Sequence, residues 1–382
     1  MVAGHDSLKR IIPALAISAI GALFYNTLPL YVGAAQDGLN LSNREAGLLP
    51  AAFFAGYNLV TVGAFFWIRR WNWRVATTIW LPVAILGLLG STFFPSRLGL
   101  FLSTAISGGG FAALYGIGTT ILADTSNPAR WYGMKIALEA VPGAALLFIL
   151  PSTLIADYGF PGVVYALVGV SLLMSVFLAT LPASSDVERN SEAVALGSSA
   201  EAVHSFAIWL ALLGTLLFFS AASGLWAFIE RMGSALTFEA DAIGTLLSIT
   251  LIFATLGSLT TAWIGKRLGN VKPFIFSAVL MILASGMLYG TPTFTLYAMG
   301  AGLLTFGIGM GLPFAVAEVA DLDADGRYII LSVPAIGSGA MIGPAVAGAL
   351  AAGDSFNMIL IVSIGAILCA IVSMFGGRRL AS

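Results

Sequence analysis

Long apolar runs alternate with short charged stretches along the whole chain. A helix of about 20 predominantly apolar residues crosses roughly 30 Å of hydrocarbon. The apolar runs, bounded by the charged stretches between them, therefore predict a series of membrane spans. The twelve predicted spans are 11–34, 45–67, 75–94, 98–121, 132–156, 160–181, 205–229, 240–264, 273–290, 293–317, 328–351 and 356–376.

Composition agrees with an integral membrane protein. Hydrophobic residues make up 59% of the chain and charged residues 9%, whereas an ordinary soluble domain is about a quarter charged. The single Cys369 excludes an intrachain disulfide. His5 and His204 lie in polar segments, and no group of His, Cys, Asp and Glu has metal-ligand spacing. We therefore expect no metal, no cofactor, no nucleic-acid partner and no enzymatic activity.

The basic residues between the predicted spans fall mainly on one side of the membrane. Cytoplasmic loops carry an excess of Lys and Arg, so the crowded side is expected to be cytoplasmic, with both chain termini on it. This predicts a multi-pass protein of the inner membrane. The crowded side holds Lys9, Arg10, Arg69, Arg70, Arg74, Arg130, Lys135, Arg189, Lys266, Arg267, Lys272, Arg327, Arg378 and Arg379, and the other side holds Arg44, Arg97 and Arg231.

The longest polar stretch divides the chain into two halves. "ASSDVERNSEAVALGSSAEAVHS" at 183–205 is rich in Ser, Ala and Glu, and six spans are predicted on either side of it. We expect an N-terminal six-helix bundle at 1–182, a cytoplasmic linker at 183–204 and a C-terminal six-helix bundle at 205–382.

The two halves also repeat each other. A shift of 197 residues (265 − 68) places "IRRWN" at 68–72 on "GKRLG" at 265–269, and it places Asp124 on Asp321. Arg130 falls on Arg327 by the same shift. Two halves of the same orientation are typical of a parallel internal repeat, which is a transporter architecture.

These punctuating segments resemble a motif of the major facilitator superfamily, and the likeness covers essentially the whole chain. "GAFFWIRRWNWR" and "AWIGKRLGNVK" are similar to the Gly-x-x-x-Asp-Arg-x-Gly-Arg-Arg motif, although the aspartate is missing from both. "GSGAMIGPAVAG" in the eleventh span resembles the Gly-x-x-x-Gly-Pro motif. The resemblance implies an all-α integral membrane protein with 12 transmembrane helices in two pseudo-symmetric six-helix bundles. It also implies a secondary transporter that works by alternating access on a small-molecule substrate, and we expect a monomer.

Charged groups at the predicted cytoplasmic helix ends are candidates for a gate. Ion pairs between them could hold that side closed while the other side opens, although the basic groups could equally serve only as topology signals. The candidate gate residues are Arg69, Arg70, Asp124, Arg130, Lys266, Arg267, Asp321 and Arg327.

Polar and aromatic residues within the spans outline a candidate substrate path. In the resembled fold, spans 1, 4, 7 and 10 line the path, and spans 2, 5, 8 and 11 lie beside it. Each aromatic could instead be a packed or interfacial side chain, and each asparagine could hydrogen-bond neighbouring helices. The substrate-binding candidates are Tyr25, Asn26, Tyr57, Asn58, Tyr115 and Trp226, and the proton-coupling candidates are Glu139, Glu230 and Glu318.

Glu139 is the strongest of the acidic candidates. It lies roughly 13 Å into the fifth predicted span at about 1.5 Å per residue, close to the middle of the hydrocarbon core. A carboxylate there is costly unless it is paired, protonated or facing water. We prefer the hypothesis that Glu139 faces the path and takes up and releases a proton, with Pro142 and Gly143 letting the helix bend. The alternative is an ion pair with Lys135, one turn earlier.

The substrate is predicted from the charge of the path. Lys135 lies barely more than one turn inside its predicted span, so the path lacks the cationic anchor that a carboxylate or phosphate would favour. This favours a small neutral, weakly cationic or amphipathic organic molecule and proton-coupled efflux. The alternatives are a proton-symport uptake permease for a small neutral or aromatic nutrient, and a receptor or scaffold without transport activity.

Overall fold

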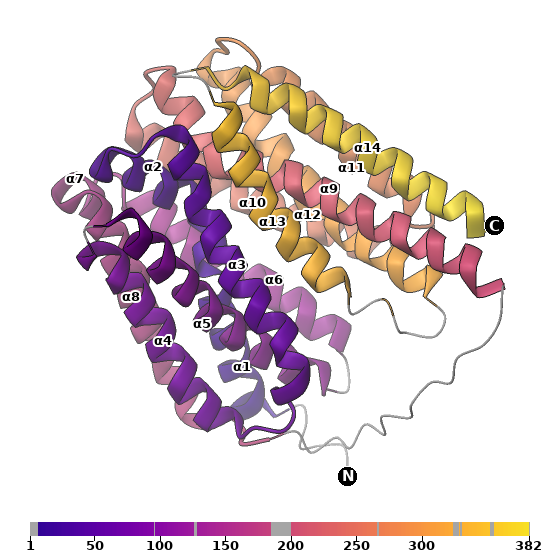
Figure 1. The fold of residues 1–382 in the computed structure, drawn as a ribbon, viewed down its shortest axis with the longest axis horizontal. Helices are drawn as coiled ribbons and strands as arrows, with labels where there is room; N and C mark the ends of the chain where they lie inside the picture. The colour runs from indigo at the N-terminus through magenta and orange to yellow at the C-terminus, as the bar shows by residue number, and fades with distance from the viewer. Residues whose placement is uncertain are drawn as a thin grey trace.

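The computed structural model describes residues 7–94, 96–125, 128–184, 200–265, 267–323, 328, 331–351 and 355–381. Helices joined by short turns make up nearly all of this part of the chain (Figure 1). The N-terminal half contains α1 (Leu8–Asn26), α2 (Leu28–Leu39), α3 (Asn43–Trp67), α4 (Trp73–Phe93), α5 (Arg97–Ala123), α6 (Pro128–Ile149), α7 (Leu154–Tyr158), α8 (Phe160–Ser175) and the short 3-10 helix η1 (Val176–Thr180). The C-terminal half contains α9 (Ala200–Ala235), α10 (Ala240–Ile264), α11 (Val271–Met287), α12 (Phe294–Leu322), α13 (Ser332–Leu350) and α14 (Asn357–Ala381).

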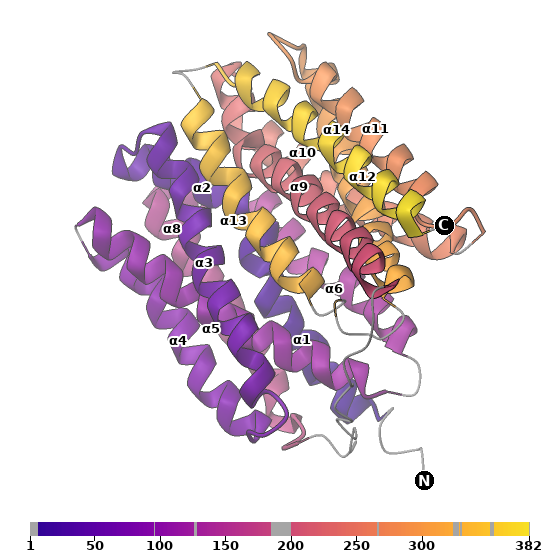
Figure 2. The same ribbon diagram turned by 45° about the vertical axis from the view of Figure 1, so that its right-hand side comes forward.

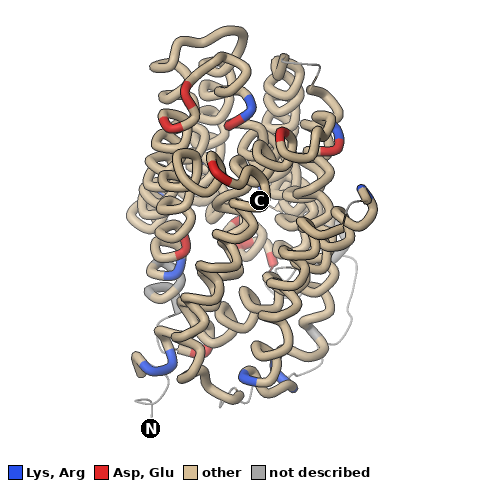
Figure 3. Tube along the Cα trace, turned by 90° about the vertical axis from the view of Figure 1, so that its left-hand side faces the viewer, with Lys and Arg blue, Asp and Glu red and all other residues tan. Residues whose placement is uncertain are grey.

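The predicted all-α fold with twelve transmembrane helices is confirmed. Among the described residues, 10 helices are long and apolar enough to cross a membrane. The remaining two spans are α11, which is apolar but has 17 residues, and α6, which carries Lys135 and Glu139. Figure 3 shows charged residues near both ends of the molecule and a few at mid-height, within a trace that is otherwise uncharged.

Two of the differences between predicted spans and observed helices have local reasons. The first span is broken at Thr27, whose side chain donates to the Leu23 carbonyl at 2.9 Å, and Pro29 starts the first turn of α2. The fifth span begins at Pro128 and ends at Ile149, just before Pro151. Proline suits a first helical turn and disfavours helical backbone in the residue before it. As a result, α6 begins four residues earlier than predicted.

The 197-residue repeat is visible in the helices themselves. Adding 197 to the bounds of α3 gives 240 and 264, which are the bounds of α10. Adding 197 to Arg97, the first residue of α5, gives 294, the first residue of α12. Asn40 and Thr237, which are also 197 apart, are left-handed with φ of 51° and 62°. The two halves are therefore pseudo-symmetric helix by helix.

The bundles meet along two equivalent helix pairs, α3 with α13 and α6 with α10. Gly47 of α3 lies so close to α13 that an added Cβ would sit 2.9 Å from Gly348 Cα. Gly244 of α10 approaches Leu147 of α6 and Pro151 just beyond its end. This contact is equivalent to the first, since residues 47, 147 and 151 become 244, 344 and 348 after the shift. Small residues let helix backbones pack closely in lipid, where packing drives association.

The two ends of the molecule differ in how the bundles are arranged. We call the end where α1 begins and α3 ends the basic face, and the end where α2 ends and α3 begins the opposite face. The bundles diverge toward the basic face (Figures 1 and 2), and the contacts between them described below lie from mid-membrane to the opposite face. Arg97, one of the three basic residues predicted apart from the rest, pairs with Glu45 at 3.1 Å on the opposite face.

Candidate functional site

The centre of the N-terminal bundle holds a buried ion pair. Lys135 Nζ lies 2.6 Å from Glu139 Oε1, one turn along α6, and the two side chains are 4% and 10% exposed. The structure therefore shows the ion pair that the sequence left as the alternative for Glu139. Exchange of a proton at Glu139 stays a prediction.

Lys135 lies deeper than the sequence indicated. α6 begins at Pro128, four residues before the predicted start, so Lys135 lies seven residues, or about 10 Å, along the helix, and its side chain is 4% exposed. Its ammonium group lies 3.6 Å from the centroid of the Tyr115 ring, which is a cation–π contact. A buried cation therefore lies beside two of the candidate path residues, Tyr115 and Glu139.

Close helix packing places the polar groups around this pair. Gly21 of α1 contacts the backbone of Tyr115 on α5, and Gly143 of α6 contacts the side chain of Asn26. Asn26 donates from Nδ2 to the Glu139 carbonyl at 2.8 Å, which ties α1 to α6 beside the ion pair. A side chain at Gly21 or Gly143 would push these helices apart. We call Asn26, Tyr57, Tyr115, Lys135 and Glu139 the α6 cluster.

Tyr57 completes the α6 cluster from α3. Its ring centroid lies 6.3 Å from that of Tyr115, and its phenol is within electrostatic reach of Glu139. Phe54, one turn earlier on α3, lies between Tyr57 and Tyr25, with centroid distances of 5.8 and 6.1 Å. The ion pair therefore adjoins a surface of aromatic rings.

This aromatic surface continues across the boundary between the bundles. Tyr25 of α1 stacks on Phe219 of α9 with centroids 5.7 Å apart. Trp226 of α9 is 2% exposed, and its indole N–H donates to the Tyr25 carbonyl at 2.9 Å. Asn58 of α3 abuts Gly337 of α13. In this arrangement Trp226 and Asn58 serve as contacts between bundles, while Tyr25 and Phe219 present rings near the α6 cluster.

Glu230 belongs to an ion-pair cluster at the opposite face. Arg231 donates to both oxygens of Asp37 on α2, at 2.6 and 2.7 Å, and its Nε lies 2.8 Å from Glu230 Oε2. Ser234 donates to Glu230 Oε1 at 2.6 Å. Since Asp37 belongs to one bundle and Arg231 to the other, this cluster joins the two bundles.

Glu318 lies inside the C-terminal bundle near the basic face. Its side chain is 1% exposed and lies 3.5 Å from Arg378 Nη1 of α14. Its neighbour Asp321 accepts a hydrogen bond from Asn270 at 2.8 Å. The structure therefore does not bring Glu318 to the α6 cluster.

Among the candidate gate residues that the structure describes, Arg69, Asp124 and Asp321 form their contacts within single bundles. Arg69 of α3 lies 3.0 Å from Asp124 at the end of α5. Arg70 and Arg267 are exposed. Lys266, Arg327 and the side chain of Arg130 lie outside the described part of the chain. A gate across the two bundles stays a prediction for another conformational state.

The α6 cluster is not repeated in the other half. The 197-residue shift carries Lys135, Glu139, Tyr115 and Tyr57 onto Ser332, Ile336, Leu312 and Ala254. The scaffold is thus pseudo-symmetric, but the charged and phenolic groups are not. The C-terminal bundle forms the equivalent helix packing with small and apolar residues at these positions. The fold itself therefore does not require the charged and phenolic groups of the α6 cluster.

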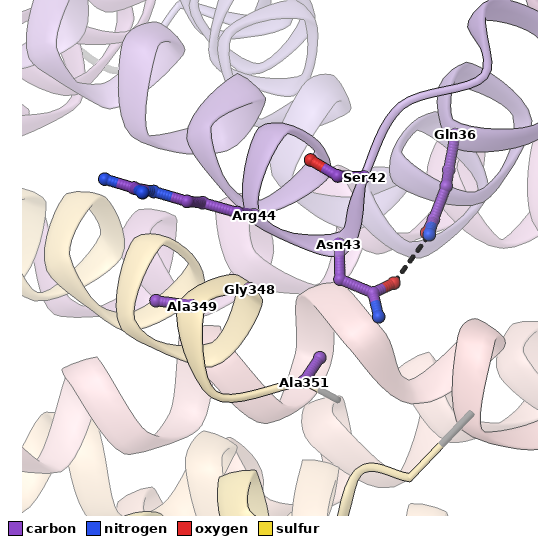
Figure 4. A pocket seen from close by; sticks show the side chains of 7 residues that line it. All are labelled: Gln36, Ser42, Asn43, Arg44, Gly348, Ala349 and Ala351. Atoms are coloured by element: carbon purple, nitrogen blue, oxygen red, sulfur yellow. Dashed lines mark hydrogen bonds between the residues drawn. The ribbon is translucent and has the colours of Figure 1, made fainter. Parts of the chain in front are cut away.

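A separate hollow of about 510 Å³ lies at the opposite face between α2, α3 and α13 (Figure 4). Gln36 donates to Asn43 at 2.6 Å across part of its wall, and Figure 4 shows Arg44 extending away from this pair. The residues that line it are Gln36, Ser42, Asn43, Arg44, Gly348, Ala349 and Ala351. None of the predicted binding residues lines this hollow, so it is not the predicted path.

Comparison with known proteins identifies the family. The model of the Major Facilitator Superfamily matches residues 14–317, which is 304 (317 − 14 + 1) of the 382 residues. The chain belongs to the major facilitator superfamily. It is therefore a multi-pass membrane protein of a transporter family, as the motifs indicated. A comparison of the sequence with curated proteins gave no match.

Solved transporters share the fold at low sequence identity. The nucleoside transporter NupG is 14% identical, with 98% of this chain and 99% of that chain covered and a TM-score of 0.74. A proton dependent oligopeptide transporter is 11% identical, with coverages of 97% and 98% and a TM-score of 0.71. A bacterial homolog of the human lysosomal transporter Spinster, inward-facing and unoccupied, is 14% identical, with coverages of 97% and 95% and a TM-score of 0.62. These likenesses concern the fold alone.

Proposed function

We propose that this chain is a proton-coupled secondary transporter that moves a small organic molecule by alternating access. The observation that supports this most is the Glu139–Lys135 pair, a carboxylate and an ammonium buried at 2.6 Å within the helix bundle. Intramembrane ionisable residues are rare, costly and usually functional. A proton on Glu139 ends the ion pair, so the cluster has two charge states that can be linked to which face is open.

The position of Lys135 changes the proposed direction of transport. The sequence favours efflux of a neutral or cationic molecule because it predicts a path without a cation. With Lys135 in the cluster, protonation of Glu139 leaves a net positive charge, which favours a substrate that moves together with the proton. We therefore place proton-symport uptake first and proton-coupled efflux second.

Transport by the purified protein in liposomes is the experiment that tests this function. A panel of labelled neutral, anionic, cationic and zwitterionic aromatic compounds is offered with and without an inward-directed proton gradient. Symport predicts accumulation of at least one compound that collapses when the gradient is removed. Gradient-independent exchange would contradict proton coupling, and binding without any flux would favour a receptor.

The orientation follows from the charges and has its own test. We propose that the basic face is cytoplasmic, with both termini and the 183–204 linker on that side and the bundles bounded at 1–182 and 205–382. Single cysteines at Ala195 and Ser355, in a Cys369→Ser background, are labelled with an impermeant maleimide in intact cells and in inverted vesicles. We expect 355 to react in cells and 195 in inverted vesicles. Reaction of both from one side would overturn this topology.

A further inference from the structure

We infer that Lys135 is the anchor for an anionic group on the substrate and that the substrate is a small aromatic carboxylate. This rests on the proposed transport function and goes beyond it by naming the substrate class and the residue that selects it. Lys135 is 4% exposed, and its ammonium group contacts the Glu139 carboxylate on one side and the face of the Tyr115 ring on the other.

The first step concerns charge. A lysine buried among helices is costly unless a negative group compensates it, and Glu139 provides that compensation in this structure. When a proton binds the Glu139 carboxylate, it forms an O–H bond there and the ion pair ends. Lys135 then keeps its cation–π contact with the Tyr115 ring but loses the negative charge of Glu139 beside it, and a cation–π contact is weaker than a buried ion pair.

A substrate carboxylate completes the exchange. It takes the place of Glu139 beside Lys135, so that one proton and one monoanion enter together and the site stays neutral overall. Release of both at the other face lets Glu139 pair with Lys135 again. Lys135 on α6 contacts Glu139 directly, Tyr115 on α5 contacts Lys135, and the ring of Tyr57 on α3 lies 6.3 Å from that of Tyr115. From α1 comes the neutral amide of Asn26, and α10 packs along α6 through Gly244.

The second step concerns shape. Next to the ion pair lies the aromatic surface of Tyr57, Phe54, Tyr25 and Phe219, whose ring centroids follow one another at 5.7–6.1 Å. Aromatic rings prefer offset-stacked or edge-to-face neighbours at such distances. A planar ring on the substrate can take such a place while its carboxylate reaches Lys135. Phe219 comes from the other bundle, so a ring held there touches both moving parts.

The third step is the comparison within the molecule. At the positions equivalent to Lys135 and Glu139 the C-terminal bundle has Ser332 and Ile336, and both belong to a helix that packs in the same way. A lysine and a glutamate are therefore not needed to hold this helix pair together. Their presence in one half only is what a substrate-selecting group predicts.

Binding to matched ligands tests the inference without a gradient. The purified protein in detergent is titrated with indole-3-acetate and with its amide, indole-3-acetamide, at pH 5 and pH 7.5, and thermal stability gives the apparent affinities. We expect the carboxylate to bind about ten-fold more tightly than the amide at pH 5, since a charge-assisted contact exceeds a neutral one by about 1.4 kcal/mol, a factor of ten. At pH 7.5 the difference should shrink. Equal affinities for the two ligands at pH 5 would overturn the inference.

Three variants separate the roles of the two charges. Glu139→Gln resembles the protonated state and should keep the preference for the carboxylate at both pH values. The Glu139→Gln, Lys135→Gln double variant leaves no buried charge in the pair and should lose the preference. Lys272→Gln, an exposed lysine at the start of α11, controls for general attraction of anions. If the double variant still prefers the carboxylate, Lys135 is not the anchor. This result is independent of whether Glu139 drives transport.

Discussion

Glu139→Gln should abolish accumulation of substrate against its gradient and leave exchange of substrate across the membrane largely intact. Glutamine matches the shape of a protonated glutamate but cannot release a proton, so the variant can bind and move substrate without coupling to the proton gradient. The side chain lies 2.6 Å from Lys135 and is 10% exposed, so the substitution removes one buried charge without opening space. Counterflow and gradient-driven uptake are measured on the same liposomes.

Glu318→Gln is the matched control for this experiment. Glu318 is also a buried acid beside a basic residue, at 3.5 Å from Arg378, but it lies within the C-terminal bundle away from the α6 cluster. We expect this variant to retain gradient-driven uptake. If Glu139→Gln accumulates substrate like the wild type while Glu318→Gln does not, the proton site lies in the C-terminal bundle and the proposed role of Glu139 is wrong.

The sequence predicted the scaffold well because its signals are repeated many times. A run of about 20 apolar residues is long enough to cross a bilayer wherever it occurs in the chain. The 197-residue shift that places "IRRWN" on "GKRLG" also places the bounds of α3 on those of α10. Boundaries were less accurate, both beside prolines and elsewhere, since α9 ends at Ala235, six residues after the predicted end at 229. Pro128 begins α6 four residues before the predicted start, and Thr27 with Pro29 divides the first span.

The site was only partly predictable, because the depth of a side chain in the bundle and the direction in which it points depend on how the helices pack. Four of the polar candidates do come together, namely Asn26, Tyr57, Tyr115 and Glu139. Lys135 was not among the candidates, because the sequence placed it near the start of its predicted span. Because the predicted start of this helix is four residues late, the sequence left Lys135 out of the candidate path and favoured a neutral or cationic substrate, whereas the substrate inferred from the structure is anionic. Periodicity also could not show that Glu318 packs inside its own bundle. An earlier helix start at Pro128 was the one signal available for Lys135.

Asp37 was not among the candidates, although it joins the two bundles. It is a lone acid near the end of the first span, with nothing in the local sequence to reveal that Arg231, 194 residues away, reaches it. The salt bridge forms only because α2 and α9 meet at the opposite face. Gly33 lies directly against Glu230 there, so the helices are already in contact one turn from the ion pair.

Asp37→Asn should shift the population toward states that are open at the opposite face. The substitution replaces a bidentate, charge-assisted contact between bundles with a neutral amide, and it leaves the Arg231–Glu230 pair within α9 in place. Because Asp37 is 67% exposed, we expect a loss of about 1 kcal/mol, or about a five-fold change in the ratio of the two states. Arg231→Ala is less suitable, since it would also leave buried Glu230 without its cation.

Distances between spin labels measure this shift. In a Cys369→Ser background, labels at Leu98 and Thr295 report on the opposite face, and labels at Trp71 and Leu268 report on the basic face; within each pair the positions are equivalent by the 197-residue repeat. We expect the first distance to lengthen and the second to shorten in Asp37→Asn. Asp157→Asn, an exposed acid on α7 at the same face, is the control and should change neither.

The same labels decide whether the Arg69–Asp124 pair takes part in a gate at the basic face. If Arg69 helps to close that face in the other state, Arg69→Gln should move both distances in the direction opposite to Asp37→Asn. An Arg69→Gln protein with unchanged distances would leave this pair as a packing contact between α3 and α5. Unchanged distances in Asp37→Asn would show that the glycine contacts of α3 with α13 and α6 with α10, and not the ion pair, hold the opposite face closed.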